Sequence, residues 1–269
     1  MRCLLILPLF LVAFSLPALA DGPAEGRIRV GTWNIEHFGN RKVPRSDEDI
    51  AAMAAFVKEL GVDVLALQEI NGAAPLKRLI KALGADYDFV IGTTGTFRTA
   101  QIGVGFLWNT KRVKLIQAEE LLDLPSKTEQ GVWIFHRKPV IAAFRTVVTG
   151  FDFRAVAVHL KAGRLNQGER WEQDVVKRSA EVEALGKRLE ELLAKPGEDQ
   201  DLLILGDFNS DPTYPSAKAF AKRFEYLKPA IKHRSITHFD EQIDHVVISK
   251  GLKEEVVAGS LKIWFERHD

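Results

Sequence analysis

The sequence has little cysteine and one long apolar run, and both features bound what the protein can be. Its single cysteine, Cys3, stands ahead of an almost wholly apolar stretch from Leu4 to Leu16. A basic residue, an apolar run of this length and the small-residue pattern Ala18-Leu19-Ala20 are typical of a secretory signal peptide. The run is shorter than the roughly 20 residues that a membrane-spanning helix needs. We therefore predict a signal peptide over residues 1–20 and export to the periplasm or the extracellular space, with an uncleaved anchor as the alternative.

Loss of that segment leaves a chain without cysteine, which excludes disulfide bonds and a cysteine-based zinc site. There is also no excess of charge of one sign. The whole chain has 37 basic and 36 acidic residues, and removal of Arg2 leaves 36 of each. Nucleic acid binding is therefore not implied by net charge, although a local basic rim can coexist with a neutral whole.

Repeats, low-complexity linkers and later membrane-length apolar stretches are also missing. A polar leader over residues 21–26 precedes a continuous pattern of alternating strands and helices. A chain of about 250 residues can bury most of its unfolded surface in one core. We expect a single domain over residues 27–269, and we favour a monomer.

The elements can be placed from hydrophobic periodicity and from their end signals. Ser46 and Asp49 resemble a capping box that starts a helix, and Gly61 ends it. Asn109-Thr110 and Thr149-Gly150 supply turn residues between neighbouring strands, as in hairpins. The hairpin-rich middle predicts an α+β fold, with two mainly antiparallel sheets packed face to face and flanked by helices. Strands are expected over residues 27–33, 63–68, 87–91, 102–108, 113–117, 140–148, 153–160, 202–205, 243–249 and 261–265, and helices over 46–60, 75–83, 170–193 and 216–224.

Several polar side chains stand where an apolar strand ends. Strand ends that converge on one rim of a sheet place such groups near a common point. Mg²⁺ usually takes one or two protein carboxylates, with water and substrate phosphate completing its shell, and Glu69 fits that role. Asp207 can accept a proton or fix a water molecule, and Asn209 can donate hydrogen bonds to a phosphoryl oxygen. Each residue alone could be an ordinary turn or surface residue, so the set carries the argument: Asn34, Glu69, His159, Asp207, Asn209 and Asp244.

Five motifs follow one another along the chain. In this order and context, the sequence resembles the endonuclease/exonuclease/phosphatase superfamily, which includes deoxyribonucleases, apurinic-site endonucleases, bacterial sphingomyelinases and inositol polyphosphate 5-phosphatases. The resemblance implies a four-layered αββα sandwich and hydrolysis of a phosphoester by in-line attack of water. It also implies a divalent cation, Mg²⁺ in the first place, with Mn²⁺ and Ca²⁺ as alternatives. The motifs are Thr32-Trp33-Asn34, Leu67-Gln68-Glu69, Val156-Ala-Val-His159, Gly206-Asp207-Phe208-Asn209-Ser210-Asp211-Pro212 and Thr237…Ile243-Asp244-His245.

The same resemblance implies roles for individual residues. Glu69 binds the metal, helped by Asn34, and Asp207 orients or deprotonates the attacking water. The scissile phosphate is contacted by three residues: Arg137, His159 and Asn209. Matches at Arg137 and His159 are those of the deoxyribonuclease branch, so we favour a phosphodiester of nucleic acid as substrate, with phospholipid and sugar or inositol phosphate as alternatives.

The C-terminal motif is where the sequence departs from the family. Asp244 matches an aspartate that orients a histidine, and family members usually supply that histidine in a closing Ser-Asp-His-x-Pro. Here the residues after Ile263 are Trp264-Phe-Glu-Arg-His268-Asp269. Either the sequence stops before the motif and before the family's last strand, or the protein is a binding module that keeps the fold without catalysis. His268 as a substitute is a further alternative, and His245 is not assigned the missing role.

The remaining basic side chains are expected to be ordinary. Arg164 and Arg170 follow His159 and could meet phosphate, but such arginines more often lie on a solvated face. Four histidines are expected on the surface or in loops: His37, His136, His233 and His238.

Overall fold

The computed structural model describes residues 26–40, 42, 44–97, 100–163, 168–229 and 241–263. The predicted signal peptide lies outside these residues, as does the polar leader up to residue 25. In the part that is described, no helix combines the length and apolar character needed to cross a bilayer. Other predicted features also lie outside it, namely Arg164, His233, Thr237, His238 and His268, and the side chain of Arg170 is not described.

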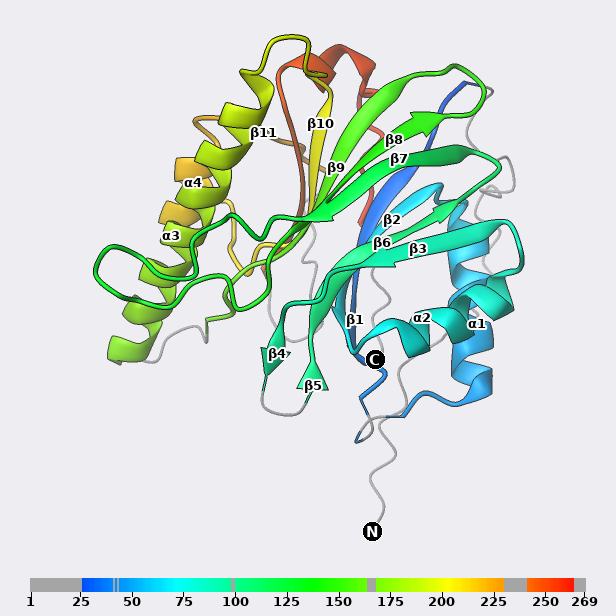
Figure 1. Cartoon of the computed structure of the whole chain (residues 1–269), viewed down its shortest axis with the longest axis horizontal. Coiled ribbons are helices and arrows are strands. Elements are labelled where there is room, and N and C mark those ends of the chain that lie inside the picture. The colour runs from blue at the N-terminus through cyan, green and yellow to red at the C-terminus, as the bar shows by residue number, and fades with distance from the viewer. Residues whose placement is uncertain are drawn as a thin grey trace.

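Two sheets face each other at the centre of the molecule (Figure 1). One has four strands in the order β1-β2-β6-β3, and the other has six in the order β11-β12-β10-β9-β8-β7. The pairs β1–β2 and β9–β10 are parallel and the others are antiparallel, so both sheets are mixed. The strands are β1 (Val30–Phe38), β2 (Val64–Ile70), β3 (Tyr87–Ile91), β6 (Gly103–Asn109), β7 (Val113–Glu120), β8 (Val140–Thr146), β9 (Asp152–His159), β10 (Leu202–Asp207), β11 (Glu225–Tyr226) and β12 (Asp244–Ile248), and the short β4 (Thr96–Phe97) pairs with β5 (Ala100–Gln101).

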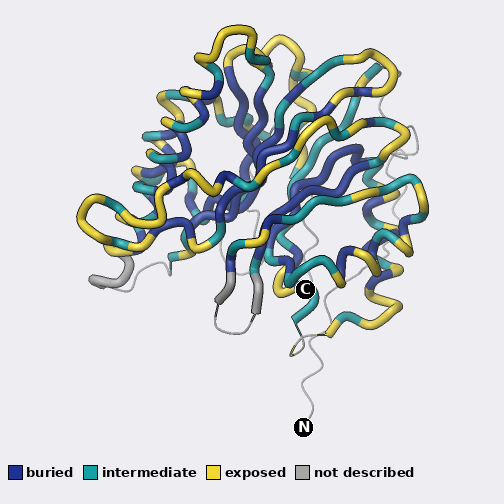
Figure 2. Tube along the Cα trace, in the orientation of Figure 1, coloured by how far each residue is buried: buried dark blue, intermediate teal, exposed yellow. Residues whose placement is uncertain are grey.

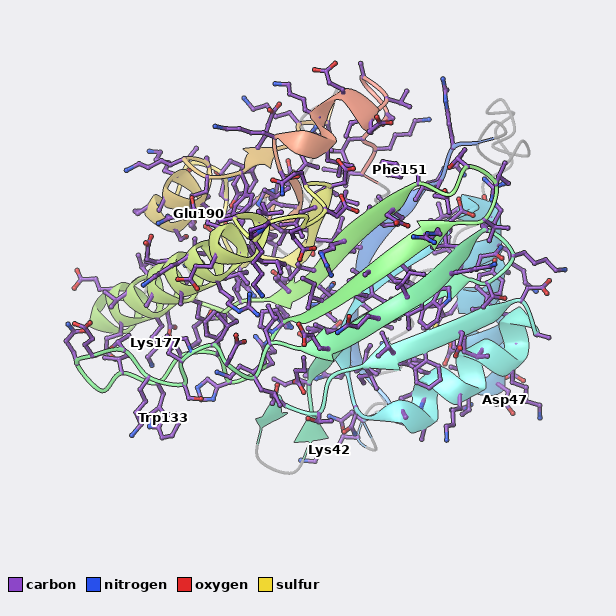
Figure 3. All side chains as sticks on the ribbon, turned by 45° about the horizontal axis from the view of Figure 1, so that its top comes forward. Lys42, Asp47, Trp133, Phe151, Lys177 and Glu190 are labelled. Atoms are coloured by element: carbon purple, nitrogen blue, oxygen red, sulfur yellow. The ribbon has the colours of Figure 1, made fainter. Side chains whose placement is uncertain are left out.

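Helices cover the outer face of each sheet. The four-stranded sheet carries α1 (Asp47–Leu60) and α2 (Ala73–Leu83), and the six-stranded sheet carries α3 (Gly168–Leu193) and α4 (Pro215–Phe220). Figure 3 labels Lys177 and Glu190 on α3 at one side of the molecule and Asp47 at the start of α1 at the other. The predicted order of layers, helix–sheet–sheet–helix, is confirmed. A short 3₁₀ helix, η1 (Gly251–Glu255), follows β12.

Three apolar cores lie between the four layers, and the central strands β2, β6, β9 and β10 are buried on both faces (Figure 2). Successive residues of β2 point to opposite sides, as the pleat of a strand requires. Val64 and Ala66 enter the core between the sheets, whereas Leu65 and Leu67 pack under α1 and α2. Burial on both faces explains why β2 reads as an unbroken apolar run rather than as an alternating one.

The predicted ends of α1 are confirmed in detail. The Ser46 side chain accepts a hydrogen bond from the backbone N–H of Asp49, and the Asp49 side chain accepts one from the backbone N–H of Ser46. Gly61 ends the helix in the left-handed conformation at φ 57°. This reciprocal capping satisfies donors that the first turn of a helix leaves unpaired.

One predicted hairpin is wrong. Asn109-Thr110 was expected to join paired strands, but β6 pairs with β2 and β3, whereas β7 pairs with β8 in the other sheet. Turn residues show that the chain reverses, but they do not show which sheet receives the next strand. The hairpin at Thr149-Gly150 is confirmed, because β8 and β9 pair antiparallel.

Other boundaries also differ from expectation, and the strand predicted over residues 27–33 is β1, which runs from Val30 to Phe38. The helix predicted to reach residue 224 ends at Phe220 and continues as a turn. Of the strand predicted over residues 261–265, the described part, 261–263, has no strand structure.

Candidate active site

The predicted strand-end residues lie together at one rim, where the two sheets meet. Asn34 lies in the middle of β1, at the point where its regular pairing with β2 breaks, and Asp207 ends β10 in the six-stranded sheet. The Asn34 Nδ2 atom donates to Asp207 Oδ2 at 3.1 Å across the gap between the sheets. Cα pairing within the second sheet places Asp207 opposite His159 on one side and opposite Asp244 on the other.

Asp207 is a buried carboxylate with neutral hydrogen-bond donors. Its Oδ1 accepts the backbone N–H of Asn209 at 2.8 Å, and its Oδ2 accepts the Asn34 amide. Burial raises the pKa of Asp207 to about 6, although the donated hydrogen bonds and the charge of Arg137 act against the rise. A carboxylate with a pKa closer to neutrality is a better acceptor for a proton from water.

Asn34 also reaches Glu69, so its amide lies between two carboxylates. The distance from Asn34 Nδ2 to Glu69 Oε1 is 3.4 Å, and Asn34 Oδ1 accepts the backbone N–H of Glu36 at 3.0 Å. In this orientation the amide nitrogen faces the acids and the oxygen faces the backbone. Metal binding by Asn34, as the family resemblance implies, would need the amide turned over, because a cation takes the oxygen.

Backbone strain marks the strand ends that carry these groups. Glu69 has φ 61°, and Glu36 and His37 have φ 36° and 55°, although none of the three is glycine. Register shifts in the β1–β2 and β2–β6 pairings lie at the same places. Non-glycine residues in this region cost about 1–3 kcal/mol each and cluster at functional sites.

His37 is a site neighbour that the sequence analysis missed. Its backbone N–H donates to Glu69 Oε2 at 3.1 Å, and its Nδ1 lies 3.4 Å from the same oxygen. The prediction that His37 is an ordinary surface or loop histidine is therefore incomplete, although its side chain is 47% exposed. A regular strand would not have brought His37 here, because the irregularity in β1 turns it toward Glu69.

His159 is buried beside Asp207. Its Nε2 lies 3.6 Å from Asp207 Oδ2, and its Nδ1 is buried and meets no hydrogen-bond partner among the described residues. Burial and the nearby charge of Arg137 hold the pKa of His159 well below its ordinary value. The imidazole is therefore neutral at physiological pH and can act as a hydrogen-bond donor rather than as a cation.

Two of the predicted phosphate contacts bind the backbone that follows β9. Arg137 donates from Nε to the carbonyl of His159 at 2.8 Å and from Nη2 to that of Leu160 at 3.0 Å. The Asn209 side chain donates to the Leu160 carbonyl at 3.1 Å. Arg137 also lies in the electrostatic range of Asp207 and Glu69. It therefore brings positive charge to the rim while two of its nitrogens hold the chain.

The Gly206–Asn209 turn is held from behind by β9 and by a buried histidine. Gly206 has φ 148°, and a Cβ there would lie 2.0 Å from the carbonyl oxygen of Val158. The glycine therefore permits the close approach of β9. His245 Nε2 lies 2.8 Å from the carbonyl of Ser210, and its ring packs edge-on against Phe208. His245 supports the turn and stays unassigned to catalysis.

The donor set fits a hard divalent cation. Glu69 and Asp207 present carboxylate oxygens on either side of Asn34, and oxygen is the ligand that Mg²⁺, Mn²⁺ and Ca²⁺ accept. Over the described ranges, no three side chains of His, Cys, Asp or Glu are placed to enclose a metal. An ion here would complete its shell with water and substrate oxygens.

A family model described as "Endonuclease/Exonuclease/phosphatase family" matches residues 31–261, which include both sheets and every residue of this rim. The chain belongs to this family. Members of the endonuclease/exonuclease/phosphatase family hydrolyse phosphoester bonds. A sequence comparison with curated proteins finds no match.

Solved structures show the same fold at low sequence identity. The human Nocturnin catalytic domain with bound sulfate is 19% identical, with 84% of each chain covered and a TM-score of 0.60. A mannosyl-6-phosphatase from Bacteroides thetaiotaomicron is 18% identical over 83% of this chain and 86% of its own, with a TM-score of 0.61. Sphingomyelinase C from Streptomyces griseocarneus is 15% identical over 83% and 84%, also at 0.61. Such identities establish the fold of this endonuclease/exonuclease/phosphatase-family chain and leave its substrate open.

Proposed function

We propose that the protein is a divalent-metal-dependent phosphoester hydrolase in which water attacks phosphorus in line. One observation carries the proposal. Asp207, a buried carboxylate with a raised pKa, is bridged by Asn34 to Glu69 at the rim where both sheets end. A base, a hard oxygen ligand and neutral donors at one point are what this reaction needs.

The residues divide the work according to their contacts. Asp207 orients the attacking water and accepts its proton. Glu69 would hold the cation, with Asn34 as helper once its amide is turned over, and a bound cation would supply charge neutralisation at the phosphoryl group. His159, as a neutral donor, stabilises charge that develops on the phosphate, and Asn209 fixes the turn beside it. Asp244, opposite Asp207, is proposed to orient a further group at the same rim.

The substrate we propose is a phosphodiester, with nucleic acid tested first. The support is the sequence resemblance of Arg137 and His159 to phosphate-contacting residues of the deoxyribonuclease branch, together with their position side by side, since Arg137 donates to the His159 carbonyl. The structural neighbours include a sugar phosphatase and a sphingomyelinase, so sugar phosphate and phospholipid are the competing classes. Mg²⁺ is the proposed ion, with Mn²⁺ and Ca²⁺ as alternatives, and the proposed location of the enzyme is outside the cytoplasm.

The test is hydrolysis by the purified protein of double-stranded DNA, RNA, sphingomyelin, a sugar phosphate and bis-(p-nitrophenyl) phosphate, each with Mg²⁺ and with EDTA. We expect hydrolysis with Mg²⁺ that EDTA and Asp207→Ala both abolish. Activity that survives both treatments would refute the mechanism. A folded protein that hydrolyses none of these substrates but binds one of them would instead be a binding module.

A further inference from the structure

A buried carboxylate on α3 binds the chain on both sides of the phosphate-side residues. Glu181 is 3% exposed. One of its oxygens accepts the backbone N–H of Phe135 at 2.8 Å, and the other accepts the backbone N–H of Lys161 at 2.7 Å. The loop that contains Trp133 runs beside α3 near Lys177 (Figure 3), and Val132 and Lys177 line one groove.

The two N–H groups belong to the segments that carry Arg137 and His159. Phe135 stands two residues before Arg137, and Lys161 stands two residues after His159. Arg137 itself donates to the His159 carbonyl. The hydrogen bonds therefore close a ring that runs from α3 through both segments and back to α3.

The ring continues into the turn that holds the proposed base. The backbone N–H of Leu160 donates to the Asp207 carbonyl at 2.9 Å, and the Leu160 carbonyl accepts the Asn209 side chain. A displacement of Lys161 would therefore also move its neighbour Leu160, which is hydrogen-bonded to the backbone of Asp207.

This arrangement is costly for folding. A buried ionised carboxylate is unfavourable unless several hydrogen bonds satisfy it, and burial raises the pKa of Glu181. Phe135, whose N–H it binds, has φ 49°, which is strained for a bulky side chain. An apolar residue would leave both N–H groups without this acceptor, so the carboxylate is explained by the two segments that it binds and not by apolar packing of α3.

Arg178 holds the same segment from one helical turn earlier. It is 1% exposed, and its Nη1 donates to the carbonyl of Lys161 at 2.9 Å. The backbone of Lys161 is thus held at its N–H by Glu181 and at its carbonyl by Arg178. This two-sided grip fixes the direction of the chain that leaves His159.

We propose that Glu181 is a positioning residue that sets the placement of Arg137 and His159 on the phosphate side of the site. This proposal rests on the proposed function. It takes His159 to act on the phosphate, as proposed above, and Arg137 to contact the phosphate, as the family resemblance implies. The proposal predicts that activity needs the carboxylate itself and not only a side chain that packs α3 against the sheet. An ionised carboxylate can accept one N–H group with each of its two oxygens. An amide would turn N–H groups toward one of them.

The first test compares Glu181→Gln with Leu189→Ala. Leu189 is fully buried two turns further along α3, in the same apolar core, and its side chain has no polar atom that could hold either segment. We expect Glu181→Gln to lower kcat/KM by about 10- to 100-fold, the usual effect of losing a group that orients active-site residues. Leu189→Ala should lower Tm by at least as much and leave kcat/KM near the wild-type value. Equal kcat/KM for Glu181→Gln and wild type would overturn the proposal.

The second test is a double-mutant cycle with Arg137→Ala. If Glu181 acts through Arg137, the loss caused by Arg137→Ala should be several-fold smaller in the Glu181→Gln background than in the wild type. With Leu189→Ala as background, the loss should be unchanged. Additive losses in the Glu181→Gln background would show a general effect on stability and refute positioning.

Binding of inorganic phosphate, followed by calorimetry, separates this proposal from the proposed function. We expect Glu181→Gln to weaken phosphate binding about tenfold, consistent with the loss of one well-placed interaction. Equal affinities would overturn the role of Glu181 even in an active enzyme. A wild-type protein that binds phosphate but hydrolyses no phosphoester would overturn the proposed function alone, and the affinities would still decide on Glu181.

Discussion

Asp207 is a buried carboxylate whose hydrogen-bond donors are an amide and a backbone N–H. Burial of charge disfavours the ionised form, and the pKa of Asp207 rises to about 6 for that reason. A group placed for stability would instead be paired directly with a cation. The surroundings of Asp207 thus favour proton transfer over stability of the fold.

Because the charge of Asp207 serves proton transfer and not stability, the variant Asp207→Asn can separate the two effects. The amide keeps the shape of the side chain and removes the buried charge, but it also turns an N–H group toward one of the two donors that Asp207 accepts, so Tm should change little. We expect kcat/KM to fall by about 10²- to 10⁴-fold, the contribution of a positioned general base. Asp152→Asn is the matched control, because Asp152 begins β9 at the end opposite His159 and is exposed in a pair with Arg145. Near-normal activity of Asp207→Asn would show that another group activates the water.

The search for polar residues at the ends of apolar strands found the residues that lie at the rim. Asn34, His159 and Asp207 each follow an apolar run, and such runs are visible in the sequence. His37 and Glu181 were missed for different reasons. A bulge in β1 places His37, and Glu181 stands among the many charges of a helix whose inward face only the packing of α3 reveals.

The parallel pairing of β9 with β10 places His159 opposite Asp207, and it depends on one glycine. Gly206 lies at φ 148°, with the Val158 carbonyl oxygen 2.0 Å from where a Cβ would stand. That neighbour is backbone within a central strand, so it cannot move aside without breaking the ladder. The two strands can therefore approach this closely only because residue 206 is glycine.

Gly206→Ala should lower stability by more than about 2 kcal/mol, because it adds a backbone clash to a strained φ. Chemical denaturation gives the value. Gly84→Ala is the control, since Gly84 has φ 105° but no atom within 4 Å of a Cβ. That change carries only the conformational cost of its backbone angles, about 1–3 kcal/mol, so it should destabilise less than Gly206→Ala. Similar losses for both variants would mean that the clash is relieved.

The end of β7 joins the two sheets near Arg137. Glu120 accepts hydrogen bonds from the backbone N–H groups of Thr93 and Thr94 at 2.8 and 2.9 Å, and from both hydroxyl groups. The Thr94 hydroxyl in turn accepts the backbone N–H of Lys138 at 2.7 Å. Glu120 therefore ties the chain after β3 to the residue that follows Arg137.

These contacts predict how the stability of the protein depends on pH. Burial opposes ionisation of Glu120, but the hydrogen bonds from Thr94 and Thr93 outweigh it and lower its pKa. A carboxyl whose pKa is lowered on folding stabilises the protein above its unfolded pKa, and this is lost as the pH falls through the folded pKa. Glu120→Gln should therefore be less stable than wild type at neutral pH and nearly equal to it in acid. Urea unfolding at several pH values checks this, and a gap that does not narrow in acid would contradict it.

At the scale of elements, the end signals of helices were more informative than the turns between strands. Ser46, Asp49 and Gly61 act within one helix, so their pattern is local and the prediction was confirmed. Asn109-Thr110 reverses the chain between two sheets, and its partners are distant in sequence. A local pattern holds no information about that choice.

Across the whole molecule, the candidate site belongs to neither sheet alone. Asn34 and Glu69 come from the four-stranded sheet, and His159, Asp207 and Asn209 follow strands of the six-stranded one. The hairpin-rich middle predicted two face-to-face sheets with flanking helices, and the family resemblance predicted the same four layers. Periodicity could not assign each strand to its sheet, because strands buried on both faces, such as β2, show no alternation.

A site shared between the sheets predicts that metal binding stabilises the fold. A ligand that binds the folded state at ten times its Kd adds about 1.4 kcal/mol. For a chain of this length, that should raise Tm by about 3–6 °C. We expect saturating Mg²⁺ to raise Tm by this amount in a calorimetric scan and EDTA to reverse it. Glu69→Gln should remove the shift, because it removes the charge that holds the ion, whereas Glu119→Gln on β7 should keep it. A shift that persists in Glu69→Gln would place the bound ion elsewhere in the protein.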